Sequence, residues 1–164
     1  MVAAQVEVVE AAGREVRVTS PHKVFFPQRG ETKLDLVRYY LAVEGPIMAA
    51  MGGRPTLMQR FPEGAGGSSF FQKRVPDNAP DWLHTATVTT VNGTTSRALV
   101  AADLAHLIWA VNLGCLGFHV WPYRADTGDE DRVDELRLDL DPQPGTGFAE
   151  AVVAAGELRA LLEE

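Results

Sequence analysis

The sequence has one cysteine, no long apolar segment and no glycine-rich phosphate loop. Cys115 stands alone, which excludes an internal disulfide and a zinc site built from cysteines. No apolar run approaches the roughly 20 residues that a membrane-spanning helix needs. Neither the GxxxxGK(S/T) nor the GxGxxG motif occurs, so both common nucleotide-binding fingerprints are missing. The N-terminus, MVAAQVEVVE, is acidic and alternating rather than typical of a signal peptide, which favours a cytoplasmic location.

Length and composition are those of a soluble globular domain. The chain has 164 residues, of which 46% are hydrophobic and 23% charged. This length suits one domain with a real hydrophobic core. We therefore predict a single domain over residues 1–164, with an N-terminal strand or extension at 1–12 and an acidic loop at 124–135.

Positive charge is scarce overall and unevenly distributed. The net charge of −7 argues against a general nucleic-acid binder. Residues 13–74, however, hold ten Lys and Arg against five Asp and Glu, whereas residues 75–164 hold five against fifteen. A basic front half followed by an acidic back half is compatible with phosphate binding by one part and metal binding by the other. The same numbers of charged residues are also expected if both halves are simply solvated surface.

Local patterns predict short strands and helices in alternation. Alternating residues around Ala11-Ala12-Gly13 and around Asn92-Gly93 indicate two hairpins. Thr32 and Asp103 are good N-caps for helices that should end near Gly45-Pro46 and at Gly114. Further strands are expected at 23–27, 56–60, 69–73 and 116–122, and a final amphipathic helix at 148–163.

The run LRLDLDPQPG at 136–145 carries the clearest chemical signal. Its alternation predicts a half-buried strand on which Asp139 and Asp141 share one face. Two carboxylates so placed repel each other unless a proton or cation lies between them, and hard divalent ions take such oxygen ligands. The pair is a candidate two-metal site for phosphoryl transfer. Most DxD sequences on solvated strands bind nothing, so the pair alone is weak.

Six sequence blocks in a fixed order make a stronger case. They are SPHKVFFP at 20–27, ETKLDLVRYY at 31–40, RPTLMQRFPEG at 54–64, FFQKRVP at 70–76, DLAHLIWAVNLGCLGFHVWP at 103–122 and LRLDLDPQPG at 136–145. Together they resemble the N-terminal half of the polymerase domain of bacterial DNA ligase D, a member of the archaeo-eukaryotic primase superfamily. The resemblance begins near residue 14 and covers the rest of the chain.

The resemblance implies a fold and an activity. The fold would be α/β of the α+β type, with a mixed or antiparallel sheet and flanking helices, primase-polymerase-like but incomplete. The activity would be that of a DNA-directed polymerase or primase in non-homologous end joining. Such a nucleotidyltransferase binds broken or gapped DNA with a 5′-phosphate and adds ribo- or deoxynucleotides from nucleoside triphosphates, using Mn²⁺ or Mg²⁺. Ligase or nuclease domains, or an end-binding protein, would be its partners in a bacterial, nucleoid-associated setting.

The resemblance also assigns catalytic and nucleotide-binding roles. Asp139 and Asp141 match the first catalytic motif and would hold the metal ions. His119 matches a histidine near the incoming nucleotide, and Arg60 fits a nucleotide contact more loosely. A histidine satisfied by neighbouring groups on a strand is the alternative for His119.

DNA-binding roles follow in the same way. Lys23 and Lys33 match two lysines that grip the 5′-phosphate, although surface lysine would be the first interpretation from composition alone. Phe70 and Phe71 match aromatics that stack on DNA bases, and Lys73 fits a DNA or phosphate contact. Since adjacent side chains on a strand point to opposite faces, we expect only one of the two phenylalanines to be largely exposed.

Two motifs implied by the resemblance are not found. A Ser-x-His element and a third metal-binding Asp would lie beyond the last helix, and residues 148–164 contain no Ser, His or Asp. We therefore expect little or no polymerase activity from this chain alone. Three functions stay open: a polymerase module that a partner or self-association through an open sheet edge completes, a non-catalytic DNA-end-binding module, and a remodelled protein-interaction domain.

Overall fold

The computed structural model describes residues 5–89, 92–128 and 132–163, and these form two compact units. The first unit runs to Asp134 and the second comprises Glu135–Glu164. The expectation of a single domain over the whole chain stays a prediction, since each unit is described here by itself.

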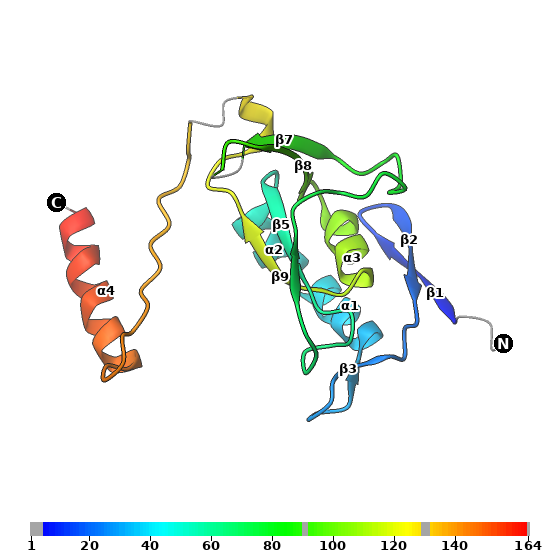
Figure 1. Cartoon of the computed structure of the whole chain (residues 1–164), viewed down its shortest axis with the longest axis horizontal. Helices are drawn as coiled ribbons and strands as arrows, with labels where there is room; N and C mark the ends of the chain where they lie inside the picture. Colours follow the sequence, from blue (N-terminus) through cyan, green and yellow to red (C-terminus); the bar gives the residue numbers. More distant parts are fainter. Residues whose placement is uncertain (1–4, 90–91, 129–131, 164) are drawn as a thin grey trace. The chain divides into compact units, whose positions relative to one another are not determined.

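The first unit contains most of the regular structure. Its strands are β1 (Val6–Ala11), β2 (Arg14–Thr19), β3 (Val24–Phe26), β4 (Glu31–Thr32), β5 (Pro55–Arg60), β6 (Phe70–Gln72), β7 (Thr85–Thr89), β8 (Thr95–Val100) and β9 (Cys115–Val120). Its helices are α1 (Lys33–Ala42), α2 (Glu44–Met51) and α3 (Leu104–Asn112), followed by the 3₁₀ turn Ala125–Thr127. The second unit holds α4 (Phe148–Leu162). The predicted α/β class is confirmed (Figure 1).

β5 is the strand around which the largest sheet is organised. Along most of its length it pairs with β9, and its two ends pair with β8 and β6 respectively. β7 extends the sheet through β8, and every one of these pairings is antiparallel. β1 with β2, and β3 with β4, form two separate antiparallel pairs.

Local signals correctly placed the first hairpin and two helix starts. Ala12 and Gly13 join β1 to β2, and both residues have positive φ. A two-residue turn with this backbone geometry matches the twist of the paired strands. Thr32 and Asp35 form a reciprocal capping box at the start of α1, and the side chain of Asp103 caps α3. The hairpin around Asn92-Gly93 is also present as β7 and β8, although residues 90–91 lie outside the described residues.

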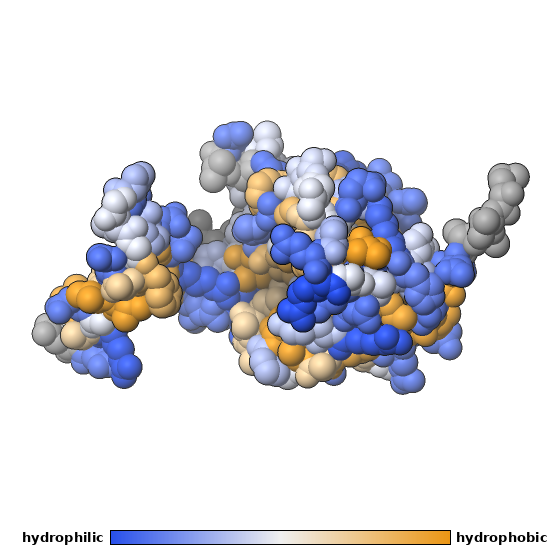
Figure 2. All heavy atoms as spheres, turned by 90° about the horizontal axis from the view of Figure 1, so that it is seen from below, coloured by the Kyte–Doolittle hydropathy of each residue, from blue (hydrophilic) through white to orange (hydrophobic). Residues whose placement is uncertain are grey.

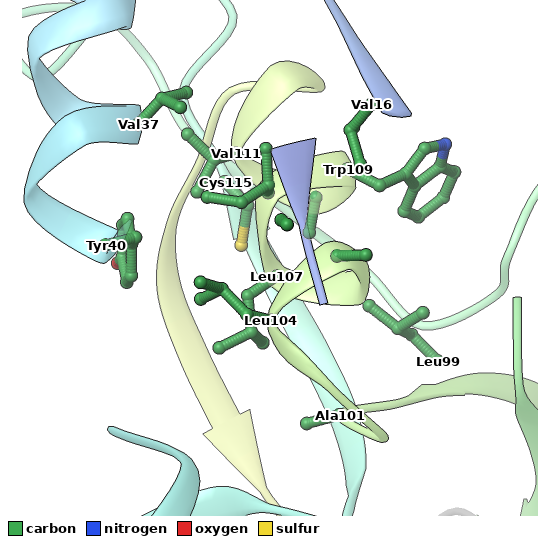
Figure 3. Close-up of a cluster of buried hydrophobic side chains, with 14 of the residues drawn as sticks. Val16, Val37, Tyr40, Leu99, Ala101, Leu104, Leu107, Trp109, Val111 and Cys115 are labelled. Carbon is green, nitrogen blue, oxygen red and sulfur yellow. The ribbon is translucent and has the colours of Figure 1, made fainter. Parts of the chain in front are cut away.

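The core is built around α3, a helix that is buried on all sides. Every residue from Leu104 to Val111 is buried, and Val37 and Tyr40 of α1 pack into the same cluster (Figure 3). Val16 of β2 and Cys115 of β9 close the cluster from two further elements. Burial raises the pKa of the Cys115 thiol to about 12, so this thiol is a packing group rather than a nucleophile.

One helix was not expected, and one expected strand is absent. The first helix ends at Ala42, near the expected Gly45-Pro46, but a second helix, α2, starts at Glu44. Pro46 is tolerated there since the first turn of a helix needs no N–H donors. The strand expected at 136–141 is absent, since residues 132–147 contain no strand. A β-strand is stabilised by hydrogen bonds to a neighbouring strand. The described residues of the unit Glu135–Glu164 contain no strand that could pair with residues 136–141.

The second unit exposes much of its apolar surface. Leu136, Leu138 and Leu140 are 72%, 52% and 39% exposed, and Val152 and Leu161 of α4 are also exposed. Figure 2 shows hydrophobic residues gathered at the surface of this unit. Within the described parts of both units, no helix is long and apolar enough to cross a membrane.

Candidate functional site

The pairing of β3 with β4 brings Lys23 and Lys33 to adjacent backbone positions. Val24 faces Thr32 in this short ladder, and the backbone N–H of Lys33 donates to the carbonyl oxygen of Lys23 at 2.9 Å. The capping box at Thr32 fixes where α1 begins and so makes Lys33 its first residue. Two lysines ten positions apart in sequence are thereby held side by side, as the resemblance requires.

Lys33 is buried and its ammonium group is fully engaged. Its Nζ donates to the backbone oxygens of Thr19 at 2.6 Å and Asn112 at 3.0 Å, with the Asn112 side-chain oxygen at 3.5 Å. Asn112 is the last residue of α3, where the helix dipole favours a cation. Burial, with the nearby charges of Lys23 and Arg60, lowers the pKa of Lys33.

Lys23 is more accessible than Lys33 and has an acidic partner. Its Nζ donates to the carbonyl oxygen of Pro62 at 2.7 Å and to Oε2 of Glu63 at 2.9 Å. The Lys23 side chain is 34% exposed and that of Glu63 is 74% exposed. The sequence analysis did not single out Glu63, because nothing in its spacing signals a contact 40 residues away.

Arg60 is held at the end of α3 rather than pointing into solvent. Its Nε donates to the carbonyl oxygen of Leu113 at 2.7 Å and its Nη1 to Oε1 of Gln72 at 2.6 Å. The guanidinium group also lies 5.2 Å from the ring centre of Phe70, a cation–π distance. The positive charge of Arg60 contributes to the lowered pKa of Lys33. The predicted nucleotide contact of Arg60 stays a prediction.

Both Phe70 and Phe71 are exposed, which corrects the expectation that only one would be. They are 46% and 54% exposed on β6, a three-residue strand. The alternation argument assumed that one face of this strand is covered by a core. Phe70 packs its ring against Arg60, but no apolar layer buries it. The two rings therefore offer two accessible aromatic groups.

His119 of β9 lies beside Phe71 of β6, and both of these strands pair with β5. The two rings meet edge to face at 5.4 Å, and Nε2 of His119 lies 3.5 Å from Oε1 of Gln59. Gly117 makes room for this arrangement, since a β-carbon there would lie 2.8 Å from the same Gln59 oxygen. His119 also lines a shallow depression of about 290 Å³ with Leu57 and Trp121.

Lys73 follows β6 directly and is exposed. Its backbone oxygen accepts a hydrogen bond from the Ser96 hydroxyl at 3.1 Å, which links the end of β6 to β8. The side chain is accessible to a phosphate in solution, and its predicted DNA contact stays a prediction.

Asp139 and Asp141 lie in the second unit and are both exposed. They line one depression of about 300 Å³ together with Thr146 and Glu150, which adds a third carboxylate on α4. Among the described residues, however, no group of three or more His, Cys, Asp or Glu side chains is close enough to hold a metal ion. Oxygen donors of the right chemistry are present, but they supply only part of a coordination shell.

An ion pair between a buried arginine and a partly exposed aspartate, which no sequence pattern signals, lies at the end of the first unit. Arg54 is fully buried and donates from both Nη atoms to the Asp134 carboxylate, at 2.7 and 2.9 Å. Arg124 adds a third hydrogen bond to Asp134 at 3.1 Å. These bonds lower the pKa of Asp134, with that to Arg54 contributing most. The arginines therefore anchor the chain just before the segment that carries Asp139.

The chain is similar to proteins of one known family. The family model for the LigD primase-polymerase domain matches residues 32–164. The multifunctional non-homologous end joining protein LigD of Mycolicibacterium smegmatis is 32% identical over 91% of this chain, and the bifunctional LigD of Bacillus subtilis is 34% identical over 91%. The chain spans only 19% and 23% of the length of these two relatives.

A solved structure shows the same fold. The polymerase domain from Mycobacterium tuberculosis ligase D in complex with DNA superimposes with a TM-score of 0.63 at 29% identity, covering 80% of this chain and 40% of that one. The family match over residues 32–164, the relatives and the shared fold lead to one conclusion: this chain belongs to the LigD primase-polymerase domain family.

Proposed function

We propose that this chain serves DNA repair by non-homologous end joining, as part of a polymerase that binds 5′-phosphorylated DNA ends and adds ribo- or deoxynucleotides. The observation that carries the proposal is the hydrogen-bonded pairing of Lys23 and Lys33 across β3 and β4. It occurs in a chain whose fold matches a polymerase domain solved in complex with DNA. The proposed setting is the bacterial cytoplasm, at the nucleoid.

The lysines supply the charge that a terminal phosphate needs. A phosphate near neutral pH carries close to two negative charges and is best stabilised by clustered cations that donate hydrogen bonds. Lys23 has three N–H donors, of which two contact Pro62 and Glu63. It is therefore the direct phosphate ligand in this proposal. Lys33 contributes its charge from just beneath, while its hydrogen bonds hold the end of α3.

The exposed aromatic rings supply a surface for bases. Phe70 and Phe71 project from β6 without an apolar cover, and stacking of a base on such a ring is worth roughly 1–3 kcal/mol. Lys73 follows on the same segment and adds a phosphate contact. DNA is thus bound by backbone charge and stacking, a combination that does not depend on base sequence.

Metal and nucleotide binding complete the proposed activity. Asp139 and Asp141 would supply carboxylate ligands to Mn²⁺ or Mg²⁺, with the remaining oxygens coming from nucleotide phosphates, water and a further carboxylate. A bound divalent ion would neutralise charge that develops on the transferred phosphoryl group. His119, beside Phe71, would contact the incoming nucleoside triphosphate, with Arg60 as a further contact.

Binding of a gapped duplex tests the proposal. Two duplexes differing only in a 5′-phosphate or 5′-hydroxyl at the downstream strand are titrated with protein at one stated salt concentration. We expect tighter binding of the phosphorylated duplex, and we expect Lys23→Ala to abolish the preference. Arg159→Ala is the matched control, because it removes one positive charge from exposed α4. Equal affinity of the wild type for both duplexes would contradict the proposal.

A non-catalytic end-binding module is the second candidate function. It is favoured by one observation: the lysines and the exposed phenylalanines all lie in the first unit, whereas the carboxylates lie in the second. Phosphate preference without nucleotide addition, even when the rest of a polymerase domain is supplied as a second polypeptide, would select this alternative.

A further inference from the structure

A tightly anchored loop carries Glu63 to the side of Lys23. The N–H of Ala65 donates to the oxygen of Phe25 at 2.8 Å, and the N–H of Phe61 donates to the oxygen of Gly114 at 2.7 Å. Gly64 approaches β3 so closely that a β-carbon would lie 2.9 Å from the oxygen of Phe25. The loop is thus fixed on one side to β3 and on the other to the turn after α3.

The stem of Glu63 is fixed, whereas its carboxylate is accessible. A β-carbon at Gly67 would lie 2.8 Å from the β-carbon of Glu63, so the loop wraps closely around this stem. The Glu63 side chain is nevertheless 74% exposed, and its Oε2 lies 2.9 Å from Nζ of Lys23. The carboxylate therefore has a defined position on Lys23 and free space into which it can turn.

We propose that Glu63 is a competing anion that occupies Lys23 until a DNA 5′-phosphate displaces it, and that it thereby weakens phosphate binding. The proposal rests on the proposed function, since it assigns Lys23 the role of phosphate ligand. A carboxylate and a phosphate oxygen are both anionic acceptors and compete for the same N–H donor. Duplexes that end in a hydroxyl offer no group of comparable charge and leave the pair of Glu63 and Lys23 intact.

The energetics favour exchange rather than a permanent block. An ion pair at a solvent-exposed site is weak, because both charges are well hydrated when apart. A phosphate brings about twice the charge of the carboxylate and is also attracted by the neighbouring Lys33. Glu63 thus lowers the affinity for a 5′-phosphate by a modest amount without preventing its binding.

The test compares two variants with the same change in charge. Glu63→Gln keeps the shape of the side chain and removes its charge. Glu31→Gln does the same on β4, where Glu31 pairs with Arg29 at 2.7 Å instead of with a lysine. Each protein is titrated with the gapped duplex carrying a 5′-phosphate or a 5′-hydroxyl, and its urea unfolding midpoint is recorded to establish that it is folded.

We expect Glu63→Gln to bind the phosphorylated duplex about two- to fivefold more tightly than the wild type, the range that loss of one exposed ion pair allows. Affinity for the hydroxyl duplex should change as little as it does in Glu31→Gln.

Other outcomes overturn the inference in distinguishable ways. If the wild type prefers phosphate and Glu63→Gln behaves like Glu31→Gln, or binds the phosphorylated duplex more weakly, Glu63 is not a competitor although the proposed function stands. If the wild type does not prefer phosphate, the proposed function fails and the inference that rests on it fails as well.

Discussion

Lys23 and Lys33 show how two identical side chains differ in what their surroundings allow. Lys33 donates all three hydrogens to protein oxygens, so it holds the end of β2 against the end of α3. Lys23 reaches the surface and shares its ammonium group with an exposed carboxylate. Lys33 is therefore mainly a structural cation, whereas Lys23 is the proposed phosphate ligand. The family resemblance pairs the two lysines but does not distinguish them.

His106 is fully buried, and the hydrogen bond that its Nε2 accepts from the His84 N–H requires the neutral imidazole. Its Nδ1 lies 2.7 Å from Asp103 Oδ1, and its Nε2 lies 3.0 Å from the backbone N of His84. Because an N–H only donates, Nε2 must be the unprotonated nitrogen. Burial lowers the pKa of His106; Asp103 opposes this effect, whereas the nearby charges of His84 and Arg14 add to it.

The stability of the protein should therefore fall in mild acid. The unfolded chain takes up a proton on His106 near its ordinary pKa of 6.5, whereas the folded chain does so only at lower pH. The contribution of neutral His106 is thus complete above about pH 6.5 and is lost as the pH drops through the folded-state value. Urea midpoints between pH 7.5 and 5 measure this loss.

His106→Gln removes the titration while keeping an acceptor for the His84 N–H, so its midpoints should depend less on pH. His22→Gln is the control, because His22 is exposed and should leave the pH dependence as in the wild type. Equal slopes for the wild type and His106→Gln would contradict the assignment.

Single elements were predictable from sequence where the signal is local. The Thr32–Asp35 box and the Ala12-Gly13 turn are complete within four residues, and the structure has both. The strand expected at 136–141 fails because its alternation says nothing about whether a partner strand is present. The contact of Glu63 with Lys23 was equally unpredictable, since an anchored loop creates it between segments far apart in sequence.

The conformation of the loop that carries Glu63 should depend on Gly64. Replacing Gly64 should therefore destabilise the protein more than replacing an ordinary turn glycine. Gly64 and Gly30 both have positive φ, of +86° and +72°, so an alanine is strained at either position. At Gly64 the new β-carbon would also lie 2.9 Å from the backbone oxygen of Phe25, which is a steric clash. At Gly30 no atom lies within 4 Å of the position of a β-carbon. Gly64→Ala should therefore lower the urea midpoint further than Gly30→Ala does.

Gly64→Ala should also change the phosphate preference, because a displaced loop moves both Glu63 and the Pro62 oxygen away from Lys23. Gly30→Ala should affect stability alone. Matching midpoints and matching duplex affinities for the two variants would show that the close approach to Phe25 is not what holds the loop.

The whole chain separates charge along its sequence in a way that suits the proposed division of labour. Residues 13–74 carry an excess of five positive charges, and residues 75–164 an excess of ten negative ones. The lysines, Arg60 and the exposed phenylalanines all belong to the basic part, and the metal-binding candidates to the acidic part. End binding should therefore be separable from nucleotide addition.

When these 164 residues are assayed on their own, nucleotide addition should be reduced more than DNA-end binding. In-line phosphoryl transfer depends on positioning and on charge neutralisation by bound metal, and removing one electrostatic stabiliser of a transition state typically costs about 10²–10³ in rate. Asp139 and Asp141 form one pair of carboxylates, and the described residues offer no group of three metal-binding side chains.

We expect the purified chain, given Mn²⁺, nucleoside triphosphates and a phosphorylated gapped duplex, to extend the primer no faster than Asp139→Asn does. The Asp139→Asn variant should at the same time bind the duplex as tightly as the wild type when metal is chelated, since its substitution lies outside the basic part of the chain. Template-dependent extension that Asp139→Asn abolishes would instead mean that this one carboxylate pair holds enough metal for turnover, with nucleotide phosphates and water completing the coordination shell.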